Sequence, residues 1–208
     1  MQQELLTEED NLVSIIKNKG KKFLKIELKI GINYGERLVK IGHNNPSVLY
    51  IGIEIKKDNI TQALYQVQEK KMDNILLING EAFSILKKIK LNHFISQVHL
   101  YFPTPKKSAF PSLYSKGLEY HQRLVNKSFI TELERLLQDG GIFRFATDHE
   151  EYYFYTIELF NLENWIAIDW SPLNIELKKN HLVGSFCEKK FVDEIDGATT
   201  YHFRVIKL

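Results

Sequence analysis

The feature that most constrains the fold is a regular alternation of short apolar runs and amphipathic segments, which begins at Phe23. The run "SVLYIGIEI" (residues 47–55) is almost unbroken, as in strands buried on both faces of a parallel sheet. Strands that alternate with helices in this rhythm form βαβ units. We therefore predict a Rossmann-like α/β fold with a doubly wound, mostly parallel sheet. Its strands are expected at residues 23–31, 47–55, 74–80, 96–102 and 141–148, and its helices at 35–42, 58–72, 81–89, 123–139 and 149–160.

The two ends of the chain extend this pattern. Residues 164–170 and 199–208 are expected to form an antiparallel pair of strands at the edge of the sheet, and residues 1–22 a helical or extended segment before a single domain, 23–208. The first strand is unusual because "LKIELKI" alternates apolar and charged residues, the pattern of a half-exposed strand. Either an N-terminal helix with paired charges covers its polar face, or this strand is less central than the topology requires.

Three residues are expected to mark helix ends. Asp58 and Asp148 precede helical patterns and are good N-cap residues. Gly140 follows a long helical pattern and is expected to stop that helix.

Composition narrows the function classes. The net charge of +2 is too small to imply nucleic acid or a membrane surface by itself. A single cysteine, Cys187, excludes an intramolecular disulfide and a multi-cysteine zinc site, and the histidines show no metal-ligand spacing. No apolar run approaches the roughly 20 residues of a membrane span, and the acidic N-terminus does not resemble a signal peptide. We predict a cytoplasmic protein without a metal.

Ligands of doubly wound sheets bind beyond the carboxyl ends of the strands. At the first such end, Gly31 to Gly35 ("GINYG") would allow close backbone approach to a ligand at a helix N-terminus, although a simple tight turn explains the same residues. Asn33 tolerates a positive φ, so the turn can survive there. Glu54 ends the second strand, where an acid can accept hydrogen bonds from ribose hydroxyls. The alternative is a surface carboxylate paired with a neighbouring lysine, Lys56 or Lys57.

The later strand ends carry further candidates. Asn79 and Glu81 follow the third strand and could lie at an adenine edge, but Glu81 fits equally well as the acidic first turn of the next helix. After the fourth strand, residues 103–119 form a long loop rich in Pro, Lys and Ser. Its lysines and aromatic residues, which include Lys106 and Lys107, suit phosphate contact and base stacking, or simply a solvated loop. Asp148 ends the fifth strand.

The order of these segments resembles the bacterial tRNA (guanine-N7)-methyltransferases, which are S-adenosylmethionine-dependent enzymes of class I. The resemblance covers about residues 23–208, and it is carried by "KIGINYGERL", "YIGIEI", "FPTPKK", "RLVNKSFITELERLLQDGG", "ATDHEEYY" and "TTYHFR". It implies a class I methyltransferase fold, an S-adenosyl-L-methionine cofactor, tRNA as the partner, and a monomer or homodimer. The cofactor-binding residues that it implies are Gly31, Gly35, Glu54, Asn79, Glu81 and Thr104, and the substrate-binding residues are Lys106, Lys107, Asp148, Thr199 and His202.

Four positions depart from the family pattern. Lys29 and His202 replace glutamates, Asn33 replaces a glycine, and Thr104 replaces the aspartate at the catalytic position. Guanine N7 already presents a lone pair, so catalysis rests mainly on alignment. Thr104 lacks the charge of an aspartate, which we expect to cost on the order of a hundredfold in rate. Lys29 would repel a cationic cofactor unless it points away or pairs with an acid, for which Glu27, Glu36 and Glu54 are candidates.

These departures leave alternatives to methylation of guanine N7. One is a catalytically degenerate relative that serves as an RNA- or protein-binding module. Another is a methyltransferase with a changed substrate, since the altered residues include positions on the substrate side.

Overall fold

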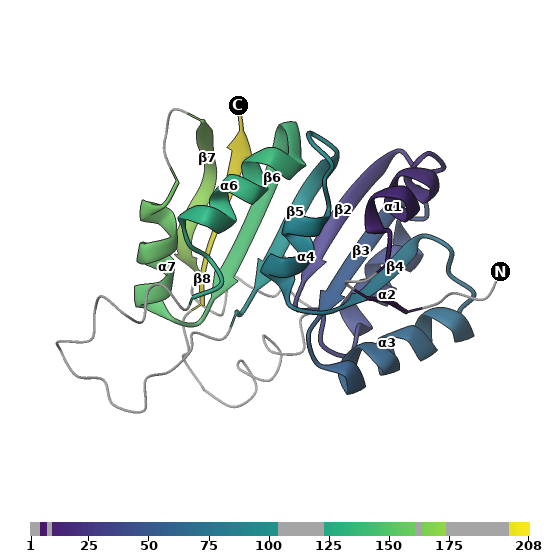
Figure 1. The fold of residues 1–208 in the computed structure, drawn as a ribbon. Helices are drawn as coiled ribbons and strands as arrows, with labels where there is room; N and C mark the ends of the chain where they lie inside the picture. The colour runs from purple at the N-terminus through teal and green to yellow at the C-terminus, as the bar shows by residue number, and fades with distance from the viewer. Residues whose placement is uncertain (1–4, 8–9, 104–122, 161–163, 174–199) are drawn as a thin grey trace.

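The fold is an open, mixed β-sheet with helices on both faces (Figure 1). A computed structural model describes residues 5–7, 10–103, 123–160, 164–173 and 200–208. Within these residues the strand order is β1-β4-β3-β2-β5-β6-β8-β7. The strands are β1 (Leu6–Thr7), β2 (Lys25–Ile30), β3 (Val48–Glu54), β4 (Ile75–Asn79), β5 (Ile95–Tyr101), β6 (Leu137–Thr147), β7 (Trp165–Leu173) and β8 (Thr200–Lys207).

Strands β1 to β6 are parallel to one another, whereas β8 runs antiparallel to both β6 and β7. The predicted doubly wound sheet with an antiparallel C-terminal edge is therefore confirmed. The order reverses at β2, because the chain continues through β3 and β4 on one side of β2 and through β5 and β6 on the other. Such a switch point opens a crevice at the carboxyl ends of the two central strands.

The helices divide between the two faces of the sheet. They are α1 (Leu12–Gly20), α2 (Glu36–Asn44), α3 (Lys57–Glu69), α4 (Ala82–Lys88), α6 (Lys127–Leu136) and α7 (Glu150–Glu158). Apolar residues of α1, α4, α6 and α7 share one buried core with the strands, and residues of α2 and α3 share a second core. Figure 1 shows α1, α4 and α6 on the near side of the sheet. Side chains alternate between the two cores along a strand, as in β3, where Ile51 and Ile53 belong to the first core and Tyr50 to the second.

The structure overturns both explanations offered for the charged first strand. β2 is central, since it pairs with β3 on one side and β5 on the other. Helix α1 covers the apolar face of β2, with Gly20 so close that an added Cβ would lie 2.6 Å from Ile26 Cδ1. On the opposite face, Glu27 and Lys29 form an ion pair with each other. The charges are thus satisfied within the face of the sheet rather than by a covering helix.

The three expected helix ends are wrong. Helix α3 begins at Lys57, so Asp58 lies in its first turn, where its charge suits the helix dipole without capping. His149, not Asp148, caps α7, and its ring accepts a hydrogen bond from the Tyr152 backbone at 3.4 Å.

Helix α6 ends at Leu136, four residues before Gly140, which lies inside β6. The last carbonyls of α6, those of Arg135 and Leu136, accept backbone hydrogen bonds from His93 and Phe94 at 2.9 Å each. A tertiary contact therefore satisfies the last carbonyl groups of the helix, which a glycine C-cap was expected to do.

Candidate cofactor and substrate site

The glycine turn between β2 and α2 begins the site. Gly31, Asn33 and Gly35 all have positive φ, at 73°, 51° and 78°, so the expectation that Asn33 would preserve the turn is confirmed. A Cβ on Gly35 would lie 2.5 Å from Ala63 Cβ, so this glycine allows α2 to pack against α3. A Cβ on Gly31 would meet nothing within 4 Å. The turn therefore has one glycine required for packing and one that faces open space.

Glu54, at the end of β3, holds this turn in place. Only 6% of its surface is exposed. Its Oε2 accepts a hydrogen bond from the Asn33 backbone N–H at 2.9 Å, and its Oε1 accepts one from the Lys56 N–H at 3.0 Å. The alternative of a surface carboxylate is wrong, because the side chain is buried between two backbone segments. Each carboxylate oxygen has a second lone pair with which it can accept a bond from a ligand hydroxyl.

Asn79 and Glu81 lie next to Glu54 at the following strand end. The Asn79 side-chain amide donates hydrogen bonds to the carbonyls of Glu54 (2.8 Å) and Ile55 (3.2 Å). Glu81 is the N-cap of α4, and its carboxylate accepts bonds from the backbone N–H groups of Phe83 (3.0 Å) and Ser84 (2.7 Å). Glu81 thus has the helix-start role that the sequence offered as its alternative, and its contact with an adenine edge stays a prediction.

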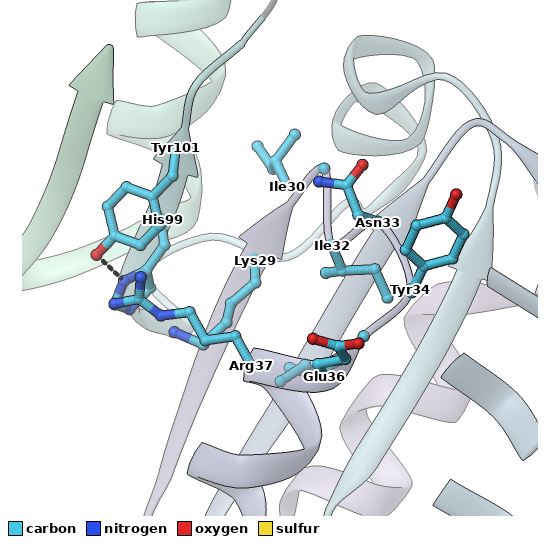
Figure 2. Close-up of a pocket in the computed structure, with 12 residues that line it drawn as sticks. Lys29, Ile30, Ile32, Asn33, Tyr34, Glu36, Arg37, His99 and Tyr101 are labelled. Atoms are coloured by element: carbon cyan, nitrogen blue, oxygen red, sulfur yellow. Dashed lines mark hydrogen bonds between the residues drawn. The ribbon is translucent and has the colours of Figure 1, made fainter. Parts of the chain in front are cut away.

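A pocket opens at the switch point between β2 and β5 (Figure 2). The glycine turn and the first turn of α2 form one wall, and side chains of β2 and β5 form the other. The polar side chains that line it are Lys29, Asn33, Tyr34, Glu36, Arg37, His99 and Tyr101. The pocket lies where the topology predicts a ligand crevice.

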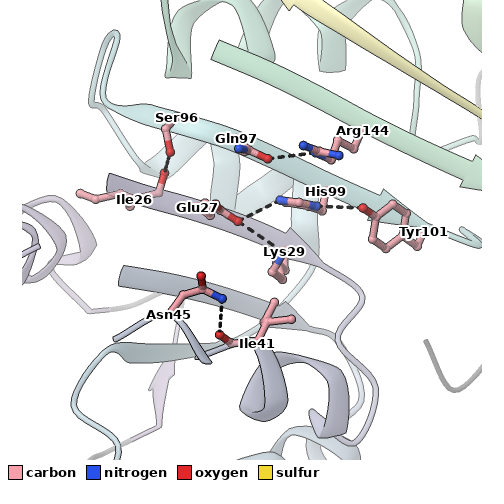
Figure 3. A network of polar contacts seen from close by, with 10 residues as sticks. All are labelled: Ile26, Glu27, Lys29, Ile41, Asn45, Ser96, Gln97, His99, Tyr101 and Arg144. Carbon is pink, nitrogen blue, oxygen red and sulfur yellow. Dashed lines mark hydrogen bonds and ion pairs between the residues drawn. The ribbon is translucent and has the colours of Figure 1, made fainter. Parts of the chain in front are cut away.

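Behind this pocket lies a polar network in which the sequence indicated only the possible pairing of Lys29 with Glu27 (Figure 3). Glu27 Oε2 lies 3.6 Å from Lys29 Nζ and 3.1 Å from His99 Nε2. His99 Nδ1 lies 2.9 Å from the Tyr101 hydroxyl. All four side chains come from the two central strands, β2 and β5. One signal was available: His99 interrupts an apolar strand just as Glu27 and Lys29 do.

Burial and mutual contact shift the ionisation of this network. Burial lowers the pKa of Lys29 to about 7, against the opposite effect of Glu27, and Arg37 lowers it further. Burial also lowers the pKa of His99 to about 3, and the charge of Lys29 adds to that effect. Although burial raises the pKa of Glu27, the His99 hydrogen bond and the charge of Lys29 hold it below its usual range. Near neutral pH the network holds an ionised Glu27, a neutral His99 and a Lys29 close to its midpoint.

The structure answers how the chain accommodates Lys29. Of the three candidate acids, Glu27 is the one that pairs with it. Lys29 nevertheless lines the pocket, together with Arg37, whose guanidinium lies 4.8 Å from the centre of the Tyr101 ring. The end of the pocket near β5 therefore carries Arg37 and Lys29, and Lys29 stands where the family pattern has an acid.

The predicted substrate residues fall into two groups. Asp148 is exposed immediately after β6, and His202 is buried in β8, where it lies opposite Ala146 of β6. Both lie at the carboxyl ends of the parallel strands, which is the side of the sheet on which the pocket opens. The other predicted substrate and catalytic positions lie outside the described residues: Thr104, Lys106, Lys107 and Thr199.

Two kinds of feature were also sought among the described residues, a metal site and a membrane-spanning helix. No group of three or more His, Cys, Asp or Glu side chains that could hold a metal ion occurs among the described residues. None of the helices described here is long and apolar enough to cross a membrane.

Comparison with known proteins assigns the family. A family model described as a putative methyltransferase, Methyltransf_4, matches residues 24–181. The chain belongs to this methyltransferase family. The match includes the glycine turn, Glu54 and the strands that carry the pocket.

Relatives of known name agree with this assignment. A protein of Buchnera aphidicola subsp. Schizaphis graminum named tRNA (guanine-N(7)-)-methyltransferase is 29% identical over 181 residues, which cover 86% of this chain and 70% of that protein. A protein of the same name from Francisella philomiragia is 30% identical over 139 residues, which cover 67% of this chain and 57% of that protein. The aligned part thus spans less than two thirds of the Francisella protein.

Several solved structures of methyltransferases share this fold. A 30S ribosomal A1408 methyltransferase from an uncultured bacterium superposes with a TM-score of 0.64 at 18% identity, over 96% of this chain and 94% of that one. At this identity the likeness concerns the fold, which is that of class I methyltransferases.

Proposed function

We propose that this chain is an S-adenosylmethionine-dependent methyltransferase that acts on guanine N7 in tRNA. The observation that carries the proposal is the buried Glu54 carboxylate, fixed to the glycine turn at the switch point of the sheet. The names of the relatives supply the substrate. The proposed partner is tRNA, and the proposed compartment is the cytoplasm.

The residues present fit a nucleoside cofactor. Gly31 leaves open space where any other residue would place a Cβ, and Glu54 keeps lone pairs for two hydroxyl groups. When bound, the cofactor supplies a methyl group on a positively charged sulfur. Gly31, Gly35 and Glu54 would hold its nucleoside part, with Asn79 and Glu81 at the base. Thr104, which lies outside the described residues, is proposed as a further cofactor-binding residue.

On the substrate side, the chain has mainly to orient the base. Guanine N7 carries an available lone pair, so no proton has to be removed before methyl transfer. Effective alignment alone can supply a large share of the rate enhancement. Asp148 and His202 are proposed to position the RNA at the edge of the sheet, together with Lys106, Lys107 and Thr199.

One observation favours the rival function, a binding module without catalysis. Two cations, Lys29 and Arg37, line the pocket where a cationic cofactor would bind. A degenerate protein would bind tRNA without binding the cofactor. A protein with a changed substrate would bind the cofactor and leave tRNA unmethylated.

Incubation with labelled cofactor and an unmodified tRNA transcript tests the proposal. We expect N7-methylguanosine in the nuclease digest, separated by liquid chromatography. Glu54→Gln removes the charge that accepts ligand hydroxyls, and we expect it to weaken cofactor binding about tenfold or more by calorimetry. Glu69→Gln, at an exposed position at the end of α3, is the matched control. If the wild-type protein forms no N7-methylguanosine in tRNA and also binds no cofactor, the proposed function is refuted.

A further inference from the structure

The end of the pocket near β5 has an unusual charge pattern. Among the residues that line the pocket, Lys29 and Arg37 are cationic and Glu36 is anionic. In Figure 2 the side chains of Lys29 and Arg37 extend toward His99 and Tyr101, whereas Glu36 lies apart from them, below the glycine turn. The two signs of charge therefore occupy different parts of the same pocket.

The ion pair with Glu27 does not use all the binding capacity of Lys29. An ammonium group has three donors, and the Lys29 Nζ–Glu27 Oε2 distance of 3.6 Å exceeds the usual hydrogen-bond length of about 2.9 Å. The same Glu27 oxygen also contacts His99 Nε2 at 3.1 Å. Lys29 thus shares one acid with a second partner, and the residue also lines the pocket.

A carboxylate is the group that this arrangement suits. Lys and Arg are the side chains that bind carboxylates through charge-assisted hydrogen bonds, and a half-buried site strengthens such bonds. A sulfonium or ammonium group placed there would be repelled by both cations.

We infer that Lys29 and Arg37 form a carboxylate-binding subsite, which takes the carboxylate of the cofactor's amino-acid part and points it toward β5. The inference rests on the proposed function, since it assigns the orientation of the same ligand. The ammonium of that amino-acid part is left to the side of the pocket where Glu36 lies. The lysine at this position is then a specificity-determining residue rather than a mark of lost binding.

The subsite has a measurable proton linkage. Since burial lowers the pKa of Lys29 to about 7, only part of the protein carries a charged Lys29 at pH 7.5. A carboxylate beside Lys29 stabilises the charged form and raises that pKa, so binding takes up protons. A cationic group would lower the pKa of Lys29, and binding would release protons.

The other groups around Lys29 do not obscure this signal. The pKa of His99 is about 3 and that of Tyr50 about 12, so neither changes charge near pH 7.5. The remaining charged or titratable groups near Lys29 come from its own strand and from the elements packed against it, and they are Glu27, Arg37, Tyr101 and Arg144, while Glu36 lines another part of the same pocket.

Calorimetry with two nucleosides tests the inference. S-adenosylhomocysteine has an uncharged sulfur and keeps the carboxylate, whereas 5′-(3-aminopropylthio)-5′-deoxyadenosine keeps the ammonium and lacks the carboxylate. Titrations at pH 7.5 in two buffers of different ionisation enthalpy count the protons exchanged. We expect proton uptake on binding of S-adenosylhomocysteine and none on binding of the decarboxylated analogue. We also expect the affinity for S-adenosylhomocysteine to be about tenfold or more above that for the analogue.

Two variants assign the effect to the subsite. Lys29→Met should abolish the proton uptake and most of the preference for the carboxylate. Arg37→Met should reduce the preference while the uptake persists, and it leaves the buried Glu27–Lys29 pair intact should Lys29→Met fold poorly. Lys40→Met, at an exposed position on α2, is the control for loss of one positive charge.

The outcomes separate the inference from the proposed function. Equal affinities for the two nucleosides, or proton release in place of uptake, would overturn the subsite and leave cofactor binding in place. Failure of both nucleosides and of S-adenosylmethionine to bind would overturn the proposed function and the subsite with it.

Discussion

At the scale of single residues, two glycines of one turn have different reasons to be glycine. Both Gly31 and Gly35 have positive φ, a conformation that is costly for other residues. Only Gly35 also faces a close neighbour, since its Cβ would lie 2.5 Å from the Ala63 Cβ and 3.1 Å from the Ala63 Cα. The packing of α2 on α3 thus depends on Gly35, whereas Gly31 leaves room on the ligand side.

Gly35→Ala is therefore expected to destabilise the fold more than Gly31→Ala. The first substitution combines backbone strain with a clash against the Ala63 Cβ, and we expect the free energy of unfolding to fall by about 2 kcal/mol or more. The second carries only the strain, about 1 kcal/mol. Urea unfolding followed by circular dichroism measures both. Equal losses for the two variants would contradict the assigned packing role of Gly35.

The sequence was informative about the site only where a strand end or a glycine marked it. The position of Glu54 at a strand end was predicted from the apolar run before it. Its backbone partners, Asn33 and Lys56, were not, because they depend on how the turn folds back. The Glu27–His99 contact joins residues far apart in the chain, and it depends on the pairing of β2 with β5, which no local pattern specifies.

At the scale of elements, the existence and order of strands and helices followed from periodicity, whereas their ends did not. The predicted central strands and the antiparallel C-terminal pair are all present. Helix α6 ends where His93 and Phe94 bind its last carbonyls, and α7 begins at His149. The end of α6 is thus set by a contact from elsewhere in the chain, and the start of α7 by a residue type that is uncommon as a cap.

Glu81 provides a test of one such cap. Its carboxylate accepts two backbone hydrogen bonds at the start of α4, so Glu81→Ala should lower the free energy of unfolding by about 1 kcal/mol. Glu81→Asp keeps a capping carboxylate and should recover most of that stability. Thermal and urea unfolding measure the difference. A fully stable Glu81→Ala protein would show that the cap contributes nothing.

At the scale of the whole molecule, one polar cluster lies at the centre of the sheet. Glu27 and Lys29 of β2 face His99 and Tyr101 of β5, at the strand pair where the chain order reverses. The cluster thus lies between the two halves of the doubly wound sheet and borders the pocket. Its ionisation links the stability of the entire fold to pH.

That linkage predicts how stability changes between pH 7 and 9.5. The pKa of Lys29 is about 7 in the fold and 10.5 in its ordinary environment, so the unfolded chain binds more protons over this range. Stability therefore rises with pH, and this contribution is complete only above about pH 10.5. Buried Tyr50 has a pKa raised to about 12 from 10 and lowers stability only at higher pH.

Lys29→Met should remove this contribution, since methionine does not titrate. We expect the free energy of unfolding, measured by urea titration at half-unit steps of pH, to rise less steeply for Lys29→Met than for the wild type. Lys19 also has a pKa lowered by burial, and it contributes equally to both proteins, so the difference in slope isolates Lys29. Lys40→Met should follow the wild-type slope. Parallel slopes for the wild type and Lys29→Met would mean that Lys29 is charged throughout the range, and the proton uptake expected of the carboxylate subsite would then be absent as well.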